Sequence, residues 1–309
     1  MRLVFFGTPS FSVPFLSALA SEPDFEIVAV VAQPDKPAGR GHNLVAPATI
    51  TFAREHMVPT HQFPTLKSTD AADTLRALNA DAFVVVAYGK LIPESILSIP
   101  PLGCINVHPS LLPRHRGPAP MQAAIKEGDA QTGVTIMLLD KGMDTGPLLA
   151  SESIQLDADE TYPSLEAKVQ TVGGPLLVQT LKRVGQKDII PVTQDDAKAT
   201  VTRLLERDDG RIDWAQPMEN IDRIHRAYQP WPGTWNTWND LRLKWIEMHP
   251  VDFHADVPPG TVTVKEGRLF VDAFNGTIEI LRIQPEGKAA MTAAEFLRGH
   301  GEIQGALLN

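Results

Sequence analysis

The sequence contains little cysteine and no long apolar run. Cys104 is the only cysteine among 309 residues, so neither an internal disulfide nor a CxxC pair can form, which excludes a disulfide-stabilised secreted scaffold. No segment has the about 18 consecutive apolar residues that a membrane span needs. The small residues at 18–21 resemble a secretory cleavage site, but residues 7–10 (GTPS) interrupt the apolar stretch before them. We therefore expect a cytoplasmic protein without a membrane anchor.

Positive charge is also scarce. The chain has 28 Lys and Arg residues against 37 Asp and Glu residues, which gives a net charge of −9. This balance excludes a protein that coats nucleic acid with a uniformly basic surface, although a local basic patch can still bind an anion. The length and the 43% hydrophobic content suffice for two domains. We expect a first domain at 1–189, a linker at 190–205 and a second domain at 206–309.

Several common cofactor and nucleophile motifs are missing. Residues 7–9 (GTP) occupy the turn where a dinucleotide-binding fold carries GxGxxG, which argues against an NAD-type cofactor. The sequence also lacks a GxxxxGK[ST] phosphate loop, an HExxH helix and a GxSxG nucleophile turn. The nine histidines show no convincing metal-ligand spacing, so we expect no metal site.

The first half alternates apolar runs with helical patterns. The expected strands are Leu3–Phe6, Ile27–Ala32, Phe83–Ala87, Cys104–Val107 and Gly133–Leu138. Such continuous apolar runs are typical of a parallel sheet that is covered on both faces. The pattern predicts an α/β domain with an open, doubly wound, mainly parallel sheet.

The later segments have a different pattern. A long helical pattern at 164–184 contains Gly173-Gly174-Pro175, and the proline is expected to kink or split that helix. From residue 262 onward, short alternating runs are separated by Glu266-Gly267 and Asn275-Gly276, which are hairpin signals. These features predict a smaller antiparallel β-barrel, similar to an OB-fold, as the second domain.

The densest group of polar residues lies at the end of the fourth expected strand. Because side chains alternate along a strand, Asn106 and His108 project from one face while Ile105 and Val107 pack on the other. Ligands of open α/β sheets bind beyond the carboxyl ends of strands. An amide there can donate to a developing oxyanion, and an imidazole can transfer a proton near pH 7. The alternative is that both side chains only satisfy turn backbone.

A second candidate is the glycine-rich loop at 140–147, directly after the fifth expected strand. Asp144 lies in it between Gly142 and Gly146, so its carboxylate could approach another loop and orient or deprotonate an imidazole. An Asp–His pair with a nearby Asn suits direct acyl transfer to an amine, without a Ser or Cys nucleophile. The alternative is that Asp140 and Asp144 are ordinary turn formers.

Four blocks of this sequence follow the order found in folate-dependent formyltransferases. The blocks are residues 106–113 (NVHPSLLP), 116–120 (RGPAP), 132–137 (TGVTIM) and 143–147 (MDTGP). The resemblance extends over nearly the whole chain, and several ordered blocks are far more specific than any one of them. It implies the formyltransferase variant of the Rossmann fold, with 10-formyltetrahydrofolate as a bound cosubstrate and no metal.

The second half indicates which acceptor the resemblance implies. Residues 213–214 (DW), 226–227 (RA), 230–233 (PWPG) and 284–288 (QPEGK) resemble family members that act on initiator methionyl-tRNA. The implied reaction is direct transfer of the formyl group to the α-amino group of the esterified methionine through a tetrahedral intermediate, a step of translation initiation. A monomer is expected, with a tRNA-binding second domain.

Matching motifs also imply roles for individual residues. Asn106, His108 and Asp144 would be catalytic. The residues expected around the folate donor are Tyr88, Gly89, Lys90, Leu91, Ile92, Ser110, Leu111, Leu112, Pro113, Leu139 and Asp140. Lys36 and Arg40 lie in the loop that the resemblance places at the acceptor end of the tRNA. Arg203 and Arg207, near the domain junction, are also expected to bind tRNA, although such scattered bases can equally form a solvated face. Many relatives continue the loop around Arg40 with consecutive lysines, whereas this chain has His42-Asn43, so fewer phosphate contacts are expected there.

Two alternatives to this function remain open at the level of sequence. A formyltransferase that acts on an amino sugar nucleotide or another small amine would carry the same three catalytic residues, because these report the donor and the chemistry but not the acceptor. A folate-binding or RNA-binding module without turnover is the other alternative. An assay that offers charged initiator tRNA, an amino sugar nucleotide and glycinamide ribonucleotide with the formyl donor distinguishes these possibilities.

Overall fold

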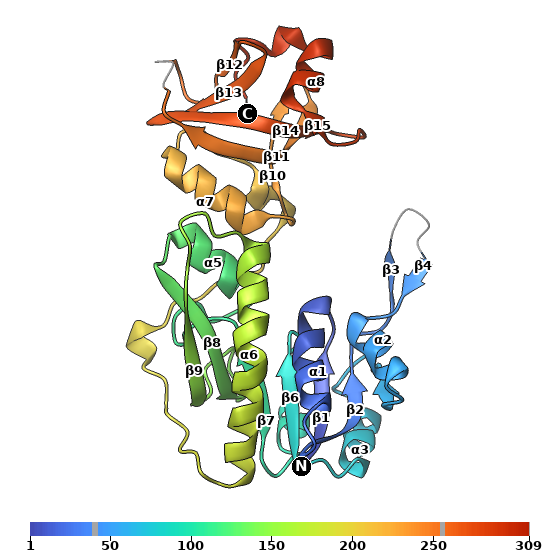
Figure 1. Ribbon diagram of the computed structural model, residues 1–309. Helices are drawn as coiled ribbons and strands as arrows, with labels where there is room; N and C mark the ends of the chain where they lie inside the picture. The colour runs from blue at the N-terminus through green and yellow to red at the C-terminus, as the bar shows by residue number, and fades with distance from the viewer. Residues whose placement is uncertain (39–42, 254–256, 309) are drawn as a thin grey trace. The chain divides into compact units, whose positions relative to one another are not determined.

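The structure is a computed structural model that describes residues 1–38, 43–253 and 257–308 (Figure 1). Arg40, one of the residues expected to bind tRNA, lies outside the described residues. The chain divides into two compact units. The first unit comprises residues 1–120, 131–155 and 166–202, and the second comprises residues 121–130, 156–165 and 203–309.

A seven-stranded sheet forms the centre of the first unit, in the order β5-β2-β1-β6-β7-β8-β9. Its strands are β1 (Arg2–Gly7), β2 (Glu26–Val31), β5 (Thr60–His61), β6 (Ala82–Val86), β7 (Cys104–His108), β8 (Gln131–Leu138) and β9 (Leu148–Gln155). The pairs from β5 to β7 are parallel, whereas β8 and β9 are antiparallel to their neighbours. The predicted α/β class with a mainly parallel sheet is therefore confirmed.

Helices connect these strands. They are the 3₁₀ turn η1 (Ser10–Ser12), α1 (Val13–Ala20), α2 (Ala48–Glu55), α3 (Thr69–Ala77), α4 (Glu94–Leu97), α5 (Pro120–Glu127) and α6 (Tyr162–Gly185), followed by the 3₁₀ turn η2 (Asp196–Lys198). None of the helices within the described residues has both the length and the apolar content that crossing a bilayer requires.

Helix α6 continues through Pro175, so the expectation that this proline splits the helix was wrong. Packing on both sides of the proline explains the continuity. Val169, Leu177 and Leu181 are completely buried. Gly173 allows a close approach to α1 (Figure 1), because a Cβ atom at this position would lie 2.6 Å from the Phe15 ring. Such burial can outweigh the cost of about 3 kcal/mol for an interior proline.

A separate two-stranded sheet consists of β3 (Lys36–Ala38) and β4 (Asn43–Val45), which pair in antiparallel fashion. No strand was predicted for these residues. Leu44 is 68% exposed, so burial does not account for the pairing of this hairpin, which extends beyond α2 (Figure 1). Lys36 begins β3 and so is presented on the hairpin.

The second unit contains an antiparallel sheet in the order β10-β11-β14-β13-β12, with β15 paired to β14. Its elements are η3 (Arg207–Gly210), α7 (Met218–Tyr228), β10 (Thr234–Trp238), β11 (Leu241–Val251), β12 (Val262–Lys265), β13 (Arg268–Ala273), β14 (Gly276–Pro285), β15 (Met291–Thr292), α8 (Ala293–Gly299) and η4 (Gly301–Ile303). The predicted antiparallel fold is confirmed. The sequence analysis missed β10 and β11, and the strand pairings of the described residues do not include one that joins β10 to β12.

A buried amide organises the core of this sheet. The indole N–H groups of Trp214 and Trp245 both donate to Oδ1 of Asn236, each at 2.9 Å. Nδ2 of Asn236 donates to the Ile212 carbonyl at 2.8 Å. Because Asn236 is completely buried, these three bonds offset the desolvation of its amide and of two indoles.

Candidate active site

Strand β7 carries two of the expected catalytic residues. Asn106 and His108 are 8% and 4% exposed, and they alternate with Ile105 and Val107, which are also buried. Since β7 runs parallel to β6, His108 lies at its carboxyl end, the edge where open α/β sheets bind ligands. The predicted common face of Asn106 and His108 follows from this alternation.

Both ring nitrogens of His108 face acceptors. Nε2 lies 2.9 Å from the His115 carbonyl oxygen, to which it can donate, and Nδ1 lies 3.5 Å from Oδ2 of Asp144. A neutral imidazole has one N–H. With the proton on Nε2, the lone pair of Nδ1 faces the Asp144 carboxylate, so a proton taken up at Nδ1 would be stabilised there by a negative charge.

Burial lowers the pKa of His108, and it is the largest influence on that group. The negative charge of Asp144 and the hydrogen bond to the His115 carbonyl raise this pKa, whereas the charge of the His115 imidazole lowers it. The net shift is downward, so His108 is neutral at pH 7 and can accept a proton. The site thus contains an imidazole in the basic form with a carboxylate beside it.

Asp144 takes its position from an unusual backbone conformation. Its φ is +56°, in the left-handed region that non-glycine residues rarely adopt. Its Oδ2 accepts a hydrogen bond of 2.8 Å from the Gly117 backbone N–H, in addition to facing His108. The structure therefore brings the predicted Asp–His pair together.

Asp140 behaves differently from Asp144. Its Oδ1 accepts from the Gly142 N–H at 2.9 Å and from the Thr145 hydroxyl at 2.7 Å. These contacts lie within the loop at 140–147, so Asp140 has the turn-forming role that the sequence left open for both aspartates.

The side chain of Asn106 makes no hydrogen bond to any part of the chain that the structure describes, although only 8% of the residue's surface is exposed. The fully buried side-chain nitrogen and oxygen atoms that lack a partner among the described residues do not include those of Asn106, so its amide keeps access to solvent. Its donor is consequently free for a ligand oxygen. On β7 it precedes His108 by two residues and shares its face.

The residues expected around the donor fall into three groups, of which Leu139 and Asp140 directly follow β8. In the first, Tyr88 is 2% exposed with its ring edge against Phe6, and the buried hydroxyl has no partner among the described residues. Burial raises the pKa of this phenol. Gly89 follows with a φ of +84°, and Lys90 donates to the Pro64 carbonyl at 3.1 Å. Leu91 is 81% exposed.

The second group belongs to the loop at 110–113. The Ser110 hydroxyl donates to the Arg114 carbonyl at 2.7 Å, and the Thr135 hydroxyl donates to the Ser110 carbonyl at 2.7 Å. The Leu112 N–H donates to the Thr135 hydroxyl at 3.2 Å. Thr135, on β8 opposite His108, thus ties this loop to the strand next to the site, a role that the sequence analysis missed.

The residues expected to bind tRNA differ in their partners. Arg203 is paired with the carboxylate of Asp209. Neither Lys36 nor Arg207 has an ion-pair partner within the described ranges. A free charge can meet a phosphate without first breaking an ion pair, so Lys36 and Arg207 are better placed for that purpose than Arg203.

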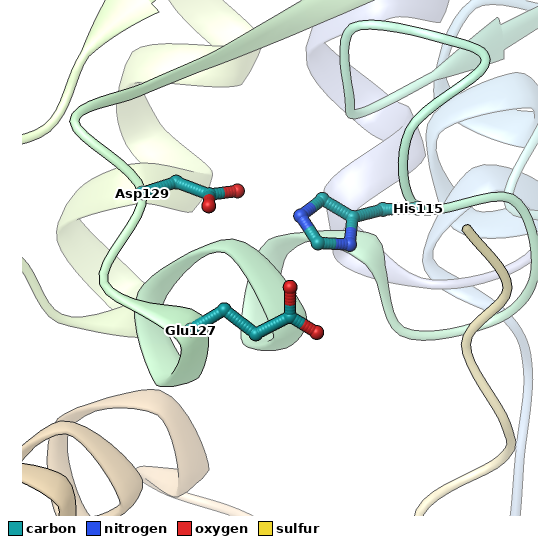
Figure 2. A group of neighbouring side chains, drawn as sticks. All are labelled: His115, Glu127 and Asp129. Carbon is teal, nitrogen blue, oxygen red and sulfur yellow. The ribbon is translucent and has the colours of Figure 1, made fainter. Parts of the chain in front are cut away.

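Two other features lie apart from these residues. Figure 2 draws His115, Glu127 and Asp129, which are residue types that can bind a metal ion. His115 belongs to the first unit and the two carboxylates to the second, so we assign no metal to this group, and the expectation of no metal stays a prediction. A cavity of about 500 Å³ in the second unit is lined by Arg211, Ile212, Asp213, Trp214, Ala215, Pro259, Leu307 and Leu308. None of the expected site residues lines it.

Comparison with known proteins defines the class. Residues 1–181 match the formyl transferase family, and residues 204–301 match the formyl transferase C-terminal domain. The chain therefore belongs to the formyl transferase family and is a transferase, as the ordered sequence blocks predicted.

Its relatives are more specific. The chain is 44% identical over 300 residues to the methionyl-tRNA formyltransferase of Roseiflexus sp. (strain RS-1). The matched region covers 97% of this chain and 92% of that protein. It is 40% identical over 307 residues to the methionyl-tRNA formyltransferase of Magnetococcus marinus, with 99% and 98% covered.

Solved structures share the fold at lower identity. HypX from Aquifex aeolicus, in complex with tetrahydrofolic acid, has a TM-score of 0.65 at 17% identity, over 98% of this chain and 47% of that one. The sugar 3N-formyl transferase WlaRD has a TM-score of 0.66 at 16% identity, over 94% and 99%. At these identities the similarity shows the fold alone.

Proposed function

We propose that this chain transfers the formyl group of 10-formyltetrahydrofolate to the α-amino group of methionine on initiator tRNA, in translation initiation. The observation that carries the chemistry is the neutral His108 beside Asp144, with the free amide of Asn106 on the same strand face. The acceptor is inferred from relatives that match both halves of the chain and are methionyl-tRNA formyltransferases.

The reaction is a direct acyl transfer. The amine nitrogen attacks the formyl carbon, and the formyl oxygen becomes an oxyanion to which Nδ2 of Asn106 donates. His108, whose Nδ1 faces Asp144, takes the proton that the amine loses. The bond between the formyl carbon and N10 of the folate then breaks, and N10 receives that proton. The products are the formylated amine and tetrahydrofolate, so atoms and charges balance without a covalent enzyme intermediate.

The donor would lie against Tyr88–Ile92, the loop at 110–113 and Leu139–Asp140. The exposed Leu91 and the partly buried Ile92 and Leu139 offer apolar surface for a pterin. Most polar side chains here are already bonded within the protein, so hydrogen bonds to the pterin would come mainly from backbone groups.

The acceptor would be held by basic residues outside this site. Lys36, Arg40 and Arg207 are proposed to contact tRNA phosphates, and Arg203 would do so after release from Asp209. In this proposal the segment 1–189 carries the chemistry and 206–309 binds tRNA. We place the reaction in the cytoplasm and assign it to a monomer, since Asn106, His108 and Asp144 all belong to one compact unit.

An acceptor panel tests the proposal. The purified chain is incubated with 10-formyltetrahydrofolate and methionyl initiator tRNA, an amino sugar nucleotide or glycinamide ribonucleotide. We expect formylation of the charged tRNA. Formylation of only a small amine would contradict the proposed acceptor, and binding of folate without turnover on any acceptor would contradict the proposed enzyme.

The Asp144→Asn variant serves as a control for the chemistry. It keeps the side-chain shape and an oxygen for the Gly117 N–H, but it removes the charge that stabilises protonated His108. We expect slower formylation and nearly unchanged donor binding. Loss of folding in this variant would instead support a structural role for Asp144.

A further inference from the structure

The segment at 192–202, expected as linker, is bound to the loops of the active site. We refer to residues 192–202 as the strap. Val192 exchanges two backbone hydrogen bonds with Leu148, at 2.8 and 2.9 Å. Towards its other end, the Thr200 carbonyl accepts from the Arg116 N–H at 2.8 Å, and the Thr202 N–H donates to the Arg116 carbonyl at 2.7 Å. All of these residues belong to the first unit.

Between these ends, the strap inserts one buried side chain. Gln194 is 8% exposed, although residues 195–198 around it are exposed. Its Nε2 donates to the Asp144 carbonyl at 2.8 Å and to the Gly146 carbonyl at 2.7 Å. Its Oε1 accepts from Nε of Arg116 at 3.0 Å. If the amide were flipped, its oxygen would face two carbonyl oxygens and its N–H groups would face a guanidinium. The orientation of the Gln194 amide is therefore unambiguous.

The contacts of Gln194 close a ring of hydrogen bonds that includes Asp144, whose carboxylate is proposed to be catalytic. The Gln194 side chain bonds to the backbone carbonyl of Asp144 and to the side chain of Arg116. Gly117, which follows Arg116, donates its N–H to Oδ2 of Asp144. Gly117 must be glycine here, because its φ is +104° and a Cβ atom would lie 2.6 Å from the Thr202 carbonyl oxygen. The strap therefore sets the distance between the two loops that meet at this carboxylate.

Gln194 also supports a conformation that Asp144 would not prefer by itself. A left-handed φ is unfavourable for a non-glycine residue, so surrounding bonds must offset its cost. Two hydrogen bonds from one buried amide, to the carbonyls on either side of Thr145, provide this offset. Without them, Asp144 could relax and its carboxylate would leave His108.

We infer that Gln194 is a positioning residue for formyl transfer, which keeps the Asp144 carboxylate against His108. This inference rests on the proposed function. Gln194 touches neither reacting group, so its effect appears in turnover and not in the binding of donor or acceptor. The strap is in this sense part of the catalytic machinery and not a passive connection.

Gln194→Glu is the test. The carboxylate keeps the length of the side chain and an acceptor for Arg116, but it places oxygen against two carbonyls and so removes both donors. We expect kcat to fall about tenfold to a hundredfold, as misplacement of a catalytic group by about 1 Å can cause. The KM values for 10-formyltetrahydrofolate and for methionyl-tRNA should stay within about twofold of the parent.

Gln186→Glu is the matched control, since Gln186 is exposed and lies outside the strap; it should retain parental kcat. Gln194→Ala is the second variant and should lower kcat in the same direction. A folded Gln194 variant with parental kcat, or with raised KM and unchanged kcat, would overturn the inference. Failure of both variants to fold would overturn it in favour of a structural role. An inactive parent would instead contradict the proposed function.

Discussion

A buried histidine and a buried asparagine of one compact unit, His108 and Asn106, can be compared with a similar pair in the other unit, His225 and Asn236. In the second unit, Nδ1 of His225 lies 2.7 Å from the Thr234 hydroxyl, and Asn236 makes three hydrogen bonds to two indoles and a carbonyl. In the first unit, His108 faces a carboxylate and Asn106 has no partner within the described residues.

Both histidines have lowered pKa values for the same main reason. Burial lowers the pKa of His225 to about 4, and it lowers that of His108 against the opposing charge of Asp144. The shift alone therefore does not mark a catalytic group. What separates the two histidines is what each ring faces: Nδ1 of His225 lies against the Thr234 hydroxyl, whereas Nδ1 of His108 faces the Asp144 carboxylate. The two amides differ as well, because Asn236 is fully bonded within the protein and Asn106 is not.

The largest expected difference is in turnover. His108→Asn should lower kcat about a thousandfold, because the proton acceptor is lost. The same change at His225 should leave kcat within about twofold. In the parent, kcat/KM should fall on the acid side at a pH below 6.5, since the lowered pKa keeps His108 neutral down to that range. Formylation rates from pH 5 to 8 check this, and equal losses of kcat in both variants would break the comparison.

The next largest effect is on stability. His225 has a folded pKa of about 4 and an unfolded pKa near 6.5, so the folded state binds fewer protons between these values. The free energy of unfolding should therefore be full above pH 6.5 and decrease by about 3 kcal/mol as pH falls towards 4. Denaturant titrations of the parent and His225→Asn across this range measure it. A parallel pH dependence in the two proteins would show that His225 is not responsible.

The two asparagines should also differ: replacing Asn106 should affect turnover, and replacing Asn236 should affect stability. Asn106→Ala should lower kcat about a hundredfold, which corresponds to about 2.7 kcal/mol of transition-state stabilisation, because an oxyanion donor is removed. Its unfolding midpoint should barely move, since no internal hydrogen bond is lost. Unchanged turnover in Asn106→Ala would remove this residue from the proposed mechanism.

The smallest effect is expected at Asn236. Asn236→Ala leaves the indole N–H groups of Trp214 and Trp245 without their acceptor, and each unpaired buried donor costs roughly 1 kcal/mol or more. The free energy of unfolding should fall by about 2 kcal/mol while kcat per folded molecule is retained. A loss of kcat without a loss of stability would contradict a purely structural role for this amide.

Much of the fold could be predicted because local chemistry was sufficient. The apolar runs that became β1, β2, β6, β7 and β8 carry β-branched and aromatic residues over the length of a buried strand. Strand β10 (TWNTW) and strand β11 mix polar and aromatic residues, and β11 has two register shifts against β14, so no clean period indicated them. Helix α6 was misjudged at Pro175 because packing, which is not local, decided its continuity.

The candidate site divides in the same way. The side-by-side placement of Asn106 and His108 follows from the period of two along a strand, and the ordered blocks indicated Asp144. The local pattern alone did not distinguish Asp144 from Asp140, because the difference lies in which groups each carboxylate meets in the fold; only the resemblance singled out Asp144. Gln194 had no local signal either, since it occurs among polar residues of an expected linker.

The sequence by itself determined the class of fold, the family and the chemical groups available for formyl transfer, because these depend on residue types and short spacings. Tertiary structure alone decided that the Asp144 carboxylate meets His108, that the His115 carbonyl engages the opposite ring nitrogen, and that Gln194 holds the loop between them. The physical reason is that these contacts join residues up to 50 positions apart, where only chain packing sets the distance.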